Sequence, residues 1–157
     1  MAADMFVCKS RILIEYLGKF LLLERQFGDK TMFILPGGKV EPFDETQSEV
    51  VRKLSGNGEE CNGDDVLLNA IRREVYEELK INLPPIIDYF CSSFFVNTQK
   101  EQVIDVVFYA KLTERPEIIV DGAEVKSFAW MDQKEILDSK QVHDWLKKNL
   151  KIFDKIY

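Results

Sequence analysis

The sequence predicts an α+β fold of the α/β/α sandwich type, in which a mixed β-sheet lies between helices. Several apolar runs have the length of strands, only two or three segments are helical, and strand and helix do not alternate regularly. The chain has 157 residues, of which 46% are apolar, enough for one domain with a proper core. We therefore expect residues 1–157 to form a single domain.

The first elements are expected to be strands. Residues 5–16 form an apolar, β-rich run, and a second apolar run at 20–23 follows the short connection Leu17-Gly18-Lys19. A glycine in such a connection predicts a β-hairpin. Residues 26–30 read as a polar loop, and the short strand at 32–35 ends where Pro36 is followed by two glycines.

The segment at about 43–63 differs in composition from its surroundings. It contains a short stretch that could form two helical turns, followed by a run rich in Gly, Asn and Glu that is typical of turns. We interpret it as an inserted surface segment. Asp64 or Asp65 then caps a helix that begins near Val66, and Pro84-Pro85 ends it.

The second half of the chain predicts three more strands and two helices. Strands are expected at 87–97, 102–112 and 124–131, with a loop at 113–123. The second of these strands is apolar almost throughout, which is typical of a strand covered on both faces. A short helix is expected at 133–137. The C-terminal helix is amphipathic, and the residues sharing its apolar face are Val142, Trp145, Leu146, Leu150 and Phe153.

Charge and composition exclude several classes of function. The 27 acidic and 21 basic side chains give a formal charge of −6, which argues against binding nucleic acid or an anionic membrane surface. Three cysteines without paired spacing and a single histidine argue against a zinc site or a disulfide framework. No apolar run reaches the length of a membrane span, and we expect a cytoplasmic protein.

Three glutamates lie on one face of the helix predicted from Val66. Glu74 stands three and four positions before Glu77 and Glu78, so the carboxylates converge, at a cost of about 0.2–0.5 kcal/mol per pair in an isolated helix. Carboxylate oxygens are the ligands that Mg²⁺ and Mn²⁺ prefer. The alternative is a solvated acidic face that Arg72 and Arg73 neutralise.

The motifs around these glutamates resemble the signature of the Nudix hydrolases. That signature is a Gly, five residues, a Glu, seven residues, and then Arg-Glu-apolar-x-Glu-Glu-x-Gly-apolar. Its core matches the sequence from Arg73 to Glu78 at every defined position, and Pro36-Gly37-Gly38-Lys39-x-Glu41 precedes it. The resemblance spans residues 5 to 150 approximately and implies the Nudix fold.

The chain departs from the signature in three ways. Gly38 and Arg73 are 35 positions apart where the family has 14, which leaves an insertion of about 21 residues (35 − 14 = 21). Counting back eight positions from Arg73 assigns the family's first Glu to Asp65 and places the insertion after Pro42. Lys80 stands where the family has Gly, so we expect Asn82 or Pro84 to end the helix.

The resemblance implies water attack on a phosphoanhydride bond, assisted by Mg²⁺ or alternatively by Mn²⁺. It assigns Glu74 and Glu78 as main metal ligands, Glu77 as ligand or base, and the Gly38 carbonyl as a further ligand. Arg73 would brace these carboxylates, the alternative being a plain ion pair with Glu77.

On the substrate side, Arg25 and Lys39 are candidates for the phosphate chain, and a solvated surface charge is the alternative for each. Phe33 is a candidate to stack on a base or sugar, as are the aromatic residues Phe27, Phe95, Trp130 and Trp145, although core packing is their commoner role. Glu124 is the first choice for a catalytic base outside the signature, and Glu101 the second.

Several alternatives stay open from the sequence. The substrate is expected to be a small nucleotide such as a (d)NTP, or alternatively ADP-ribose or a nucleotide sugar. A nucleotide-binding module without catalysis would be expected to have a damaged Arg-Glu-x-x-Glu-Glu core, which is intact here. The protein could be a monomer or a homodimer.

Overall fold

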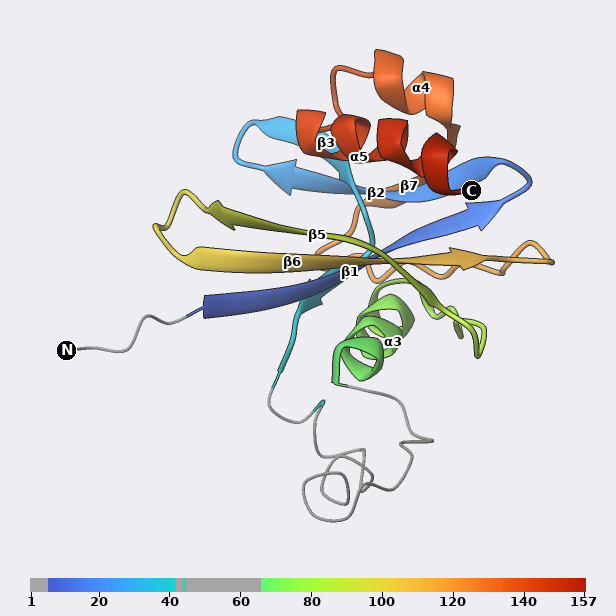
Figure 1. The fold of residues 1–157 in the computed structure, drawn as a ribbon, viewed down its shortest axis with the longest axis horizontal. Coiled ribbons are helices and arrows are strands. Elements are labelled where there is room, and N and C mark those ends of the chain that lie inside the picture. The colour runs from blue at the N-terminus through green and yellow to red at the C-terminus, as the bar shows by residue number, and fades with distance from the viewer. Residues whose placement is uncertain (1–5, 42–43, 45–65) are drawn as a thin grey trace.

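The computed structural model describes residues 6–41, 44 and 66–157. Its strands form one sheet in the order β3-β2-β1-β6-β5, with β4 paired to β1 and β7 paired to β2 (Figure 1). The elements in chain order are β1 (Phe6–Tyr16), β2 (Lys19–Phe27), β3 (Lys30–Ile34), β4 (Gly37–Lys39), α3 (Val66–Leu79), β5 (Asp88–Val96), β6 (Gln102–Lys111), β7 (Ser127–Asp132), α4 (Gln133–Asp138) and α5 (Asp144–Ile156).

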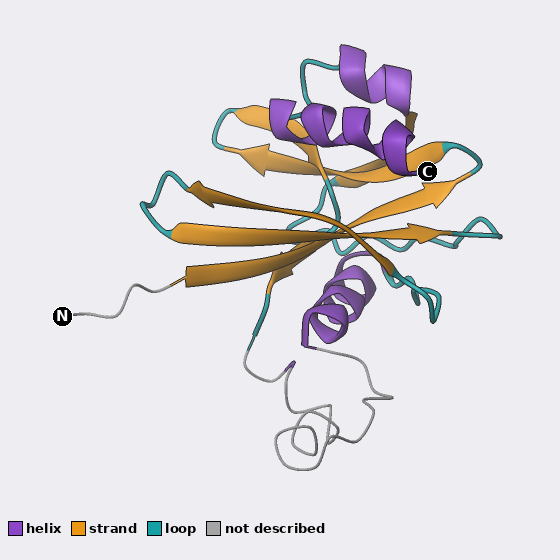
Figure 2. Ribbon diagram, in the orientation of Figure 1, coloured by secondary structure: helices purple, strands orange, loops and turns teal. Residues whose placement is uncertain are grey.

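The sheet is mixed and lies between helices, as predicted. β1 runs parallel to β6, from Phe6 opposite Gln102 to Glu15 opposite Lys111, and the other strand pairs are antiparallel. Helix α3 covers one face of the sheet, and α4 and α5 lie on the other (Figure 2). This arrangement confirms the α+β class.

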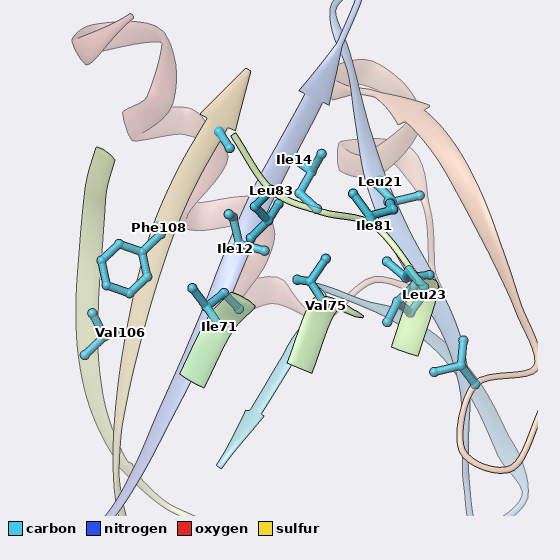
Figure 3. Packing of buried hydrophobic residues seen from close by; sticks show 13 residues of the cluster. Ile12, Ile14, Leu21, Leu23, Ile71, Val75, Ile81, Leu83, Val106 and Phe108 are labelled. Carbon is cyan, nitrogen blue, oxygen red and sulfur yellow. The ribbon is translucent and has the colours of Figure 1, made fainter. Parts of the chain in front are cut away.

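Two apolar clusters form the core, one on each face of the sheet. Neighbouring residues of β1 point to opposite faces, so Ile12 packs in the cluster with α3 while Leu13 packs in the cluster with α5. In the first cluster, Ile71 and Val75 of α3 meet the apolar residues of β1, β2 and β6 (Figure 3). The apolar face of α3 therefore fixes its acidic face relative to the sheet.

Helix α3 begins at Val66 as predicted, but it ends differently from the prediction. Its last residue is Leu79, and Lys80 has a left-handed backbone with φ of 57°. The Lys80 N–H donates to the Tyr76 carbonyl at 2.9 Å, which closes the last turn. Neither Asn82 nor Pro84 ends the helix, because Lys80 takes the left-handed conformation where the signature has glycine.

We expect Lys80→Gly to stabilise the protein by about 1 kcal/mol. A left-handed conformation costs an L-residue about 1–2 kcal/mol, and the greater freedom of glycine in the unfolded chain offsets part of the gain. Urea unfolding measures the difference. Lys80→Ala is the matched control, because it removes the contacts of the Lys80 ammonium with the Glu77 carbonyl and the Tyr76 ring but keeps the strained Cβ. A glycine variant no more stable than the alanine variant would contradict the strain.

Other boundaries differ slightly from the predictions. β2 and β3 extend to a tight turn at Gly28-Asp29, so the predicted loop at 26–30 is shorter, and β7 begins at Ser127 instead of Glu124. The predicted inserted segment at 43–63 lies outside the described residues except for Asp44. Within the described ranges, no helix has the length and apolar character needed to span a membrane.

Candidate active site

Glu78 lies against the glycine bend, Gly37–Gly38, at the start of β4. Its side chain is 6% exposed, accepts a hydrogen bond from Arg25 Nη2 at 2.7 Å, and accepts another from the Gly37 N–H at 3.0 Å. Burial raises the pKa of Glu78 above its usual value, although Arg25 and the Gly37 N–H act in the opposite direction. The bend, β2 and α3 therefore converge on this carboxylate.

Glu74 lies directly against Gly38. A Cβ atom at Gly38 would lie 2.5 to 2.7 Å from the carboxyl atoms of Glu74, so any larger residue there would displace this carboxylate. Burial raises the pKa of Glu74, and Arg73, which donates from Nη1 at 3.0 Å, opposes the shift. Two carboxylates from successive turns of α3 thus face consecutive glycines.

Arg73 connects the bend, α3 and Asp44. Its Nε donates to Asp44 Oδ1 at 2.8 Å and its Nη2 to Asp44 Oδ2 at 3.1 Å, the two-point geometry that a guanidinium favours. It also donates to Glu77 Oε2 at 3.1 Å and to the Lys39 carbonyl at 3.1 Å. The hydrogen bond to Asp44 is the largest contribution to the raised pKa of Arg73.

A hollow of about 550 Å³ lies beside Arg25. Its lining residues are Arg25, Gln26, Phe27, Gly122, Ala123, Glu124 and Lys126. The loop that precedes Glu124 is fastened to the end of α3, because the Ile119 N–H donates to the Leu79 carbonyl and the Asp121 N–H to the Glu78 carbonyl. Tertiary structure thus brings Glu124 into one hollow with Arg25, the partner of Glu78.

Comparison with known families decides the identity of this fold. The family model described as NUDIX domain matches residues 8–153, nearly the whole chain. This protein belongs to the Nudix family. As a Nudix hydrolase, it acts on phosphoanhydride bonds.

Several solved structures share the Nudix fold. A MutT protein from Methanosarcina mazei Go1 has 22% identity and a TM-score of 0.69, covering 99% of this chain and 98% of its own. A MutT NUDIX hydrolase from Burkholderia pseudomallei has 19% identity and a TM-score of 0.67, with coverages of 94% and 98%.

A larger protein from Francisella tularensis also matches. It is a bifunctional NMN adenylyltransferase/ADP ribose pyrophosphatase complexed with AMP and a Mn ion, with 18% identity, a TM-score of 0.64, and coverages of 100% of this chain and 44% of its own. At these identities the similarity shows the fold alone. No protein with a curated description matches the sequence.

Asp44, and not the predicted Asp65, takes the place of the first Glu of the Nudix signature. It stands six positions after Gly38, which preserves the spacing of glycine, five residues and an acid, and it binds Arg73. Asp65 lies outside the described residues. Asp44 and Arg73 are 29 positions apart where the family has eight, so the 21 extra residues (29 − 8 = 21) follow Asp44. Counting forward from Gly38 would have found this residue.

Asp44 is held by further contacts that fix its position. Its side chain is 3% exposed, Oδ2 accepts from the Glu41 N–H at 2.8 Å, and its carbonyl accepts from Asn69 Nδ2 at 3.0 Å. Burial alone would raise the pKa of Asp44, but Arg73 and the Glu41 N–H outweigh it and lower the pKa. Asp44 therefore carries a negative charge that neutralises the partly buried guanidinium.

We expect Asp44→Ala to destabilise the protein by about 3 kcal/mol, because it leaves a partly buried guanidinium without its main partner. Hydrolysis should fall as well, since Arg73 also positions Glu74 and Glu77. Denaturant unfolding and kcat measure the two effects. Asp44→Glu, which restores the residue of the Nudix signature, should recover most of both. Equal stability of wild type and Asp44→Ala would contradict the importance of this pair.

The remaining predicted site residues lie in different parts of the molecule. Glu77 is on the acidic face, with its side chain 57% exposed. The Lys39 side chain is exposed, and only its carbonyl contacts the site. Phe33 packs against the cluster on the α5 face, and its N–H donates to the Gln141 carbonyl. Glu101 accepts from the Asn97 side chain in the β5–β6 turn. These roles stay predictions.

The carboxylate oxygens of this site suit a hard divalent metal ion. In this structure, however, the carboxylates are paired with arginine side chains. Glu78 is bound to Arg25, and Glu74 and Glu77 to Arg73. In the part of the chain that the structure describes, no group of three or more His, Cys, Asp or Glu is arranged to hold a metal. Binding a metal therefore requires some of these ion pairs to be exchanged for metal–oxygen contacts.

Proposed function

We propose that this Nudix hydrolase is a Mg²⁺-dependent pyrophosphohydrolase that cleaves a nucleoside diphosphate linked to another moiety, with a (d)NTP as the first substrate class. One observation carries the proposal. Two carboxylates of α3, those of Glu74 and Glu78, are held against the Gly37–Gly38 bend. Arg25, which binds Glu78, also lines a hollow large enough for a small ligand.

Glu74, Glu77, Glu78 and the Gly38 carbonyl are the proposed metal ligands. Mg²⁺ keeps several of its waters and takes only one or two protein carboxylates, so it needs only part of this set, and Mn²⁺ would accept the same oxygen donors. When bound, the ion supplies positive charge next to the phosphate oxygens. The neighbouring residues of the chain decide where the substrate lies.

Cationic side chains are proposed to bind the phosphate chain. Arg25 lies between Glu78 and the hollow, and Lys39 is exposed immediately after the bend. Arg73 orients Glu74 and Glu77 and does not contact substrate. Phe27 lines the hollow and is about half exposed, so its ring offers a face for stacking, the role also predicted for Phe33.

Glu124 is proposed as the base that takes the proton of the attacking water. Its place in the hollow with Arg25 supports this role, since a base must lie near the bound phosphates. Glu124→Gln should lower kcat by about 10²–10⁴-fold without changing stability. Glu101→Gln is the matched control, because it removes a carboxylate bound to Asn97 in the β5–β6 turn. Equal kcat for the two variants would remove Glu124 from the mechanism.

ADP-ribose or a nucleotide sugar is the second candidate class. The similar fold of the Francisella tularensis NMN adenylyltransferase/ADP ribose pyrophosphatase, complexed with AMP and a Mn ion, favours it. The hollow is large enough for a second moiety beyond the diphosphate, and Lys126 and Phe27 are among its lining residues. A module that only binds nucleotides is disfavoured, because the Arg-Glu-x-x-Glu-Glu core is intact.

A panel of nucleotides tests the proposal. The purified protein is incubated with (d)NTPs, ADP-ribose and nucleotide sugars, with Mg²⁺, Mn²⁺ or excess EDTA, and the phosphate-containing products are identified by mass. We expect hydrolysis with either metal and none with EDTA. Hydrolysis that persists in EDTA would contradict the metal dependence, and a panel without any product would contradict the substrate class.

A further inference from the structure

Strand β5 is an edge of the sheet that nothing in the described chain covers. It pairs only with β6, and six large apolar side chains are exposed on it and its neighbours. These are Phe6, Tyr89, Phe94, Phe95, Val96 and Ile104. The Phe6 and Phe94 rings lie 6.2 Å apart and Phe94 is directly opposite Ile104, so these three side chains form one apolar patch, while alternation along the strand places Phe95 on the other face of the sheet. In Figure 1, β5 and β6 extend together away from α5.

The opposite edge of the sheet is protected in the usual ways. β3 has five residues against the nine of β5, begins with Lys30, and is covered by the segment before α5 through the Phe33–Val142 bridge. Short length, a lysine and a covering segment are the devices that keep an edge strand from pairing with another chain. β5 has none of these three over Tyr89–Val96, and its one protective feature is the bulge between Tyr89 and Cys91, so the edge from Ser92 to Val96 is free to pair.

The sequence of β5 suits pairing with a copy of itself. Asp88 is its only charged residue, so the strand can approach an identical strand without bringing like charges together, although each chain carries −6. Around a two-fold axis, one residue lies opposite its own copy. With Ser93 in that place, Phe94 lies opposite the small Ser92 of the second strand and Phe95 lies opposite Cys91, which borders the bulge, so these two large side chains meet small ones.

We propose that two copies of this chain associate through antiparallel pairing of their β5 strands, which extends the sheet across a two-fold axis. The backbone groups of β5 that face away from β6 then form inter-chain hydrogen bonds, and the exposed apolar residues around Phe94 are buried. This inference is independent of the proposed catalytic reaction, because none of the patch residues belongs to the acidic site.

Sedimentation velocity tests the association at micromolar protein concentration. We expect wild type to sediment as a species of twice the 18.3 kDa chain mass. Phe94→Lys and Val96→Lys should each raise the dimer dissociation constant by at least about 100-fold, since each variant places two lysines in the apolar interface. Ile119→Lys is the matched control, because Ile119 is as exposed as Val96, at 57%, but lies in the loop beyond α3. It should stay dimeric.

Hydrogen exchange supplies a second measurement. The β5 amides that point away from β6 should exchange more slowly as the protein concentration rises, and this dependence should vanish in Phe94→Lys. A wild type that sediments as a monomer, lysine variants that stay dimeric, or outer β5 amides whose exchange is independent of concentration would each overturn the proposal. Nucleotide hydrolysis is followed separately, so that a failure of the catalytic proposal is distinguished from a failure of the dimer.

Discussion

Replacing Glu78 with glutamine should reduce kcat at least about 100-fold, the scale of losing one electrostatic contributor to the transition state. The carboxylate is buried, bound to Arg25 and the Gly37 N–H, and is proposed to bind the metal. Glutamine preserves the size of the side chain but removes its negative charge, so the variant should fold and bind metal weakly. Steady-state kinetics with Mg²⁺ measures the effect, and thermal unfolding verifies that the fold is kept.

The control for this variant is Glu117→Gln, which removes an exposed carboxylate from the loop before β7. Its kcat should equal that of wild type. Added Mn²⁺ should restore part of the activity of Glu78→Gln if weaker metal binding is the cause. Equal kcat for Glu78→Gln and wild type would end the assignment of Glu78 as a metal ligand.

The largest loss of stability is expected for Gly37→Ala. Gly37 has φ of 135°, a conformation in which a Cβ atom is strained, and that Cβ would overlap the Ser10 carbonyl oxygen and lie 2.8 Å from the Arg11 Cα. Both neighbours are backbone atoms of β1 that cannot move independently. Strain and overpacking together should cost about 4 kcal/mol, which lowers the melting temperature by roughly 10 °C for a chain of this size.

Gly122→Ala is the matched control for Gly37→Ala. No atom lies within 4 Å of the place where a Cβ would be built on Gly122, so the melting temperature should change by less than about 2 °C. Calorimetry of the two variants compares glycine in a crowded bend with glycine in open space. Similar melting temperatures for both would show that the bend can relax, and would contradict the rigid contact between β4 and β1.

Much of the fold was predictable because local patterns and tertiary packing agree. The shared apolar face of the C-terminal helix predicted which of its side chains enter the core, and Leu146, Leu150 and Phe153 are buried as that pattern requires. The end of α3 was not predictable from proline positions, since a lysine in a left-handed conformation closes the helix. Local preference allows this conformation but does not favour it.

Spacings within short segments specify the family, the mixed sheet and the acidic face of α3. Which distant residues join that face depends on the tertiary structure. It brings Asp44 to Arg73, Arg25 to Glu78, and Glu124 into the hollow beside Arg25, while Phe33 packs on the other face of the sheet. Contacts between residues tens of positions apart depend on how the strands pair and where the chain turns back, and spacing along the chain does not encode them directly.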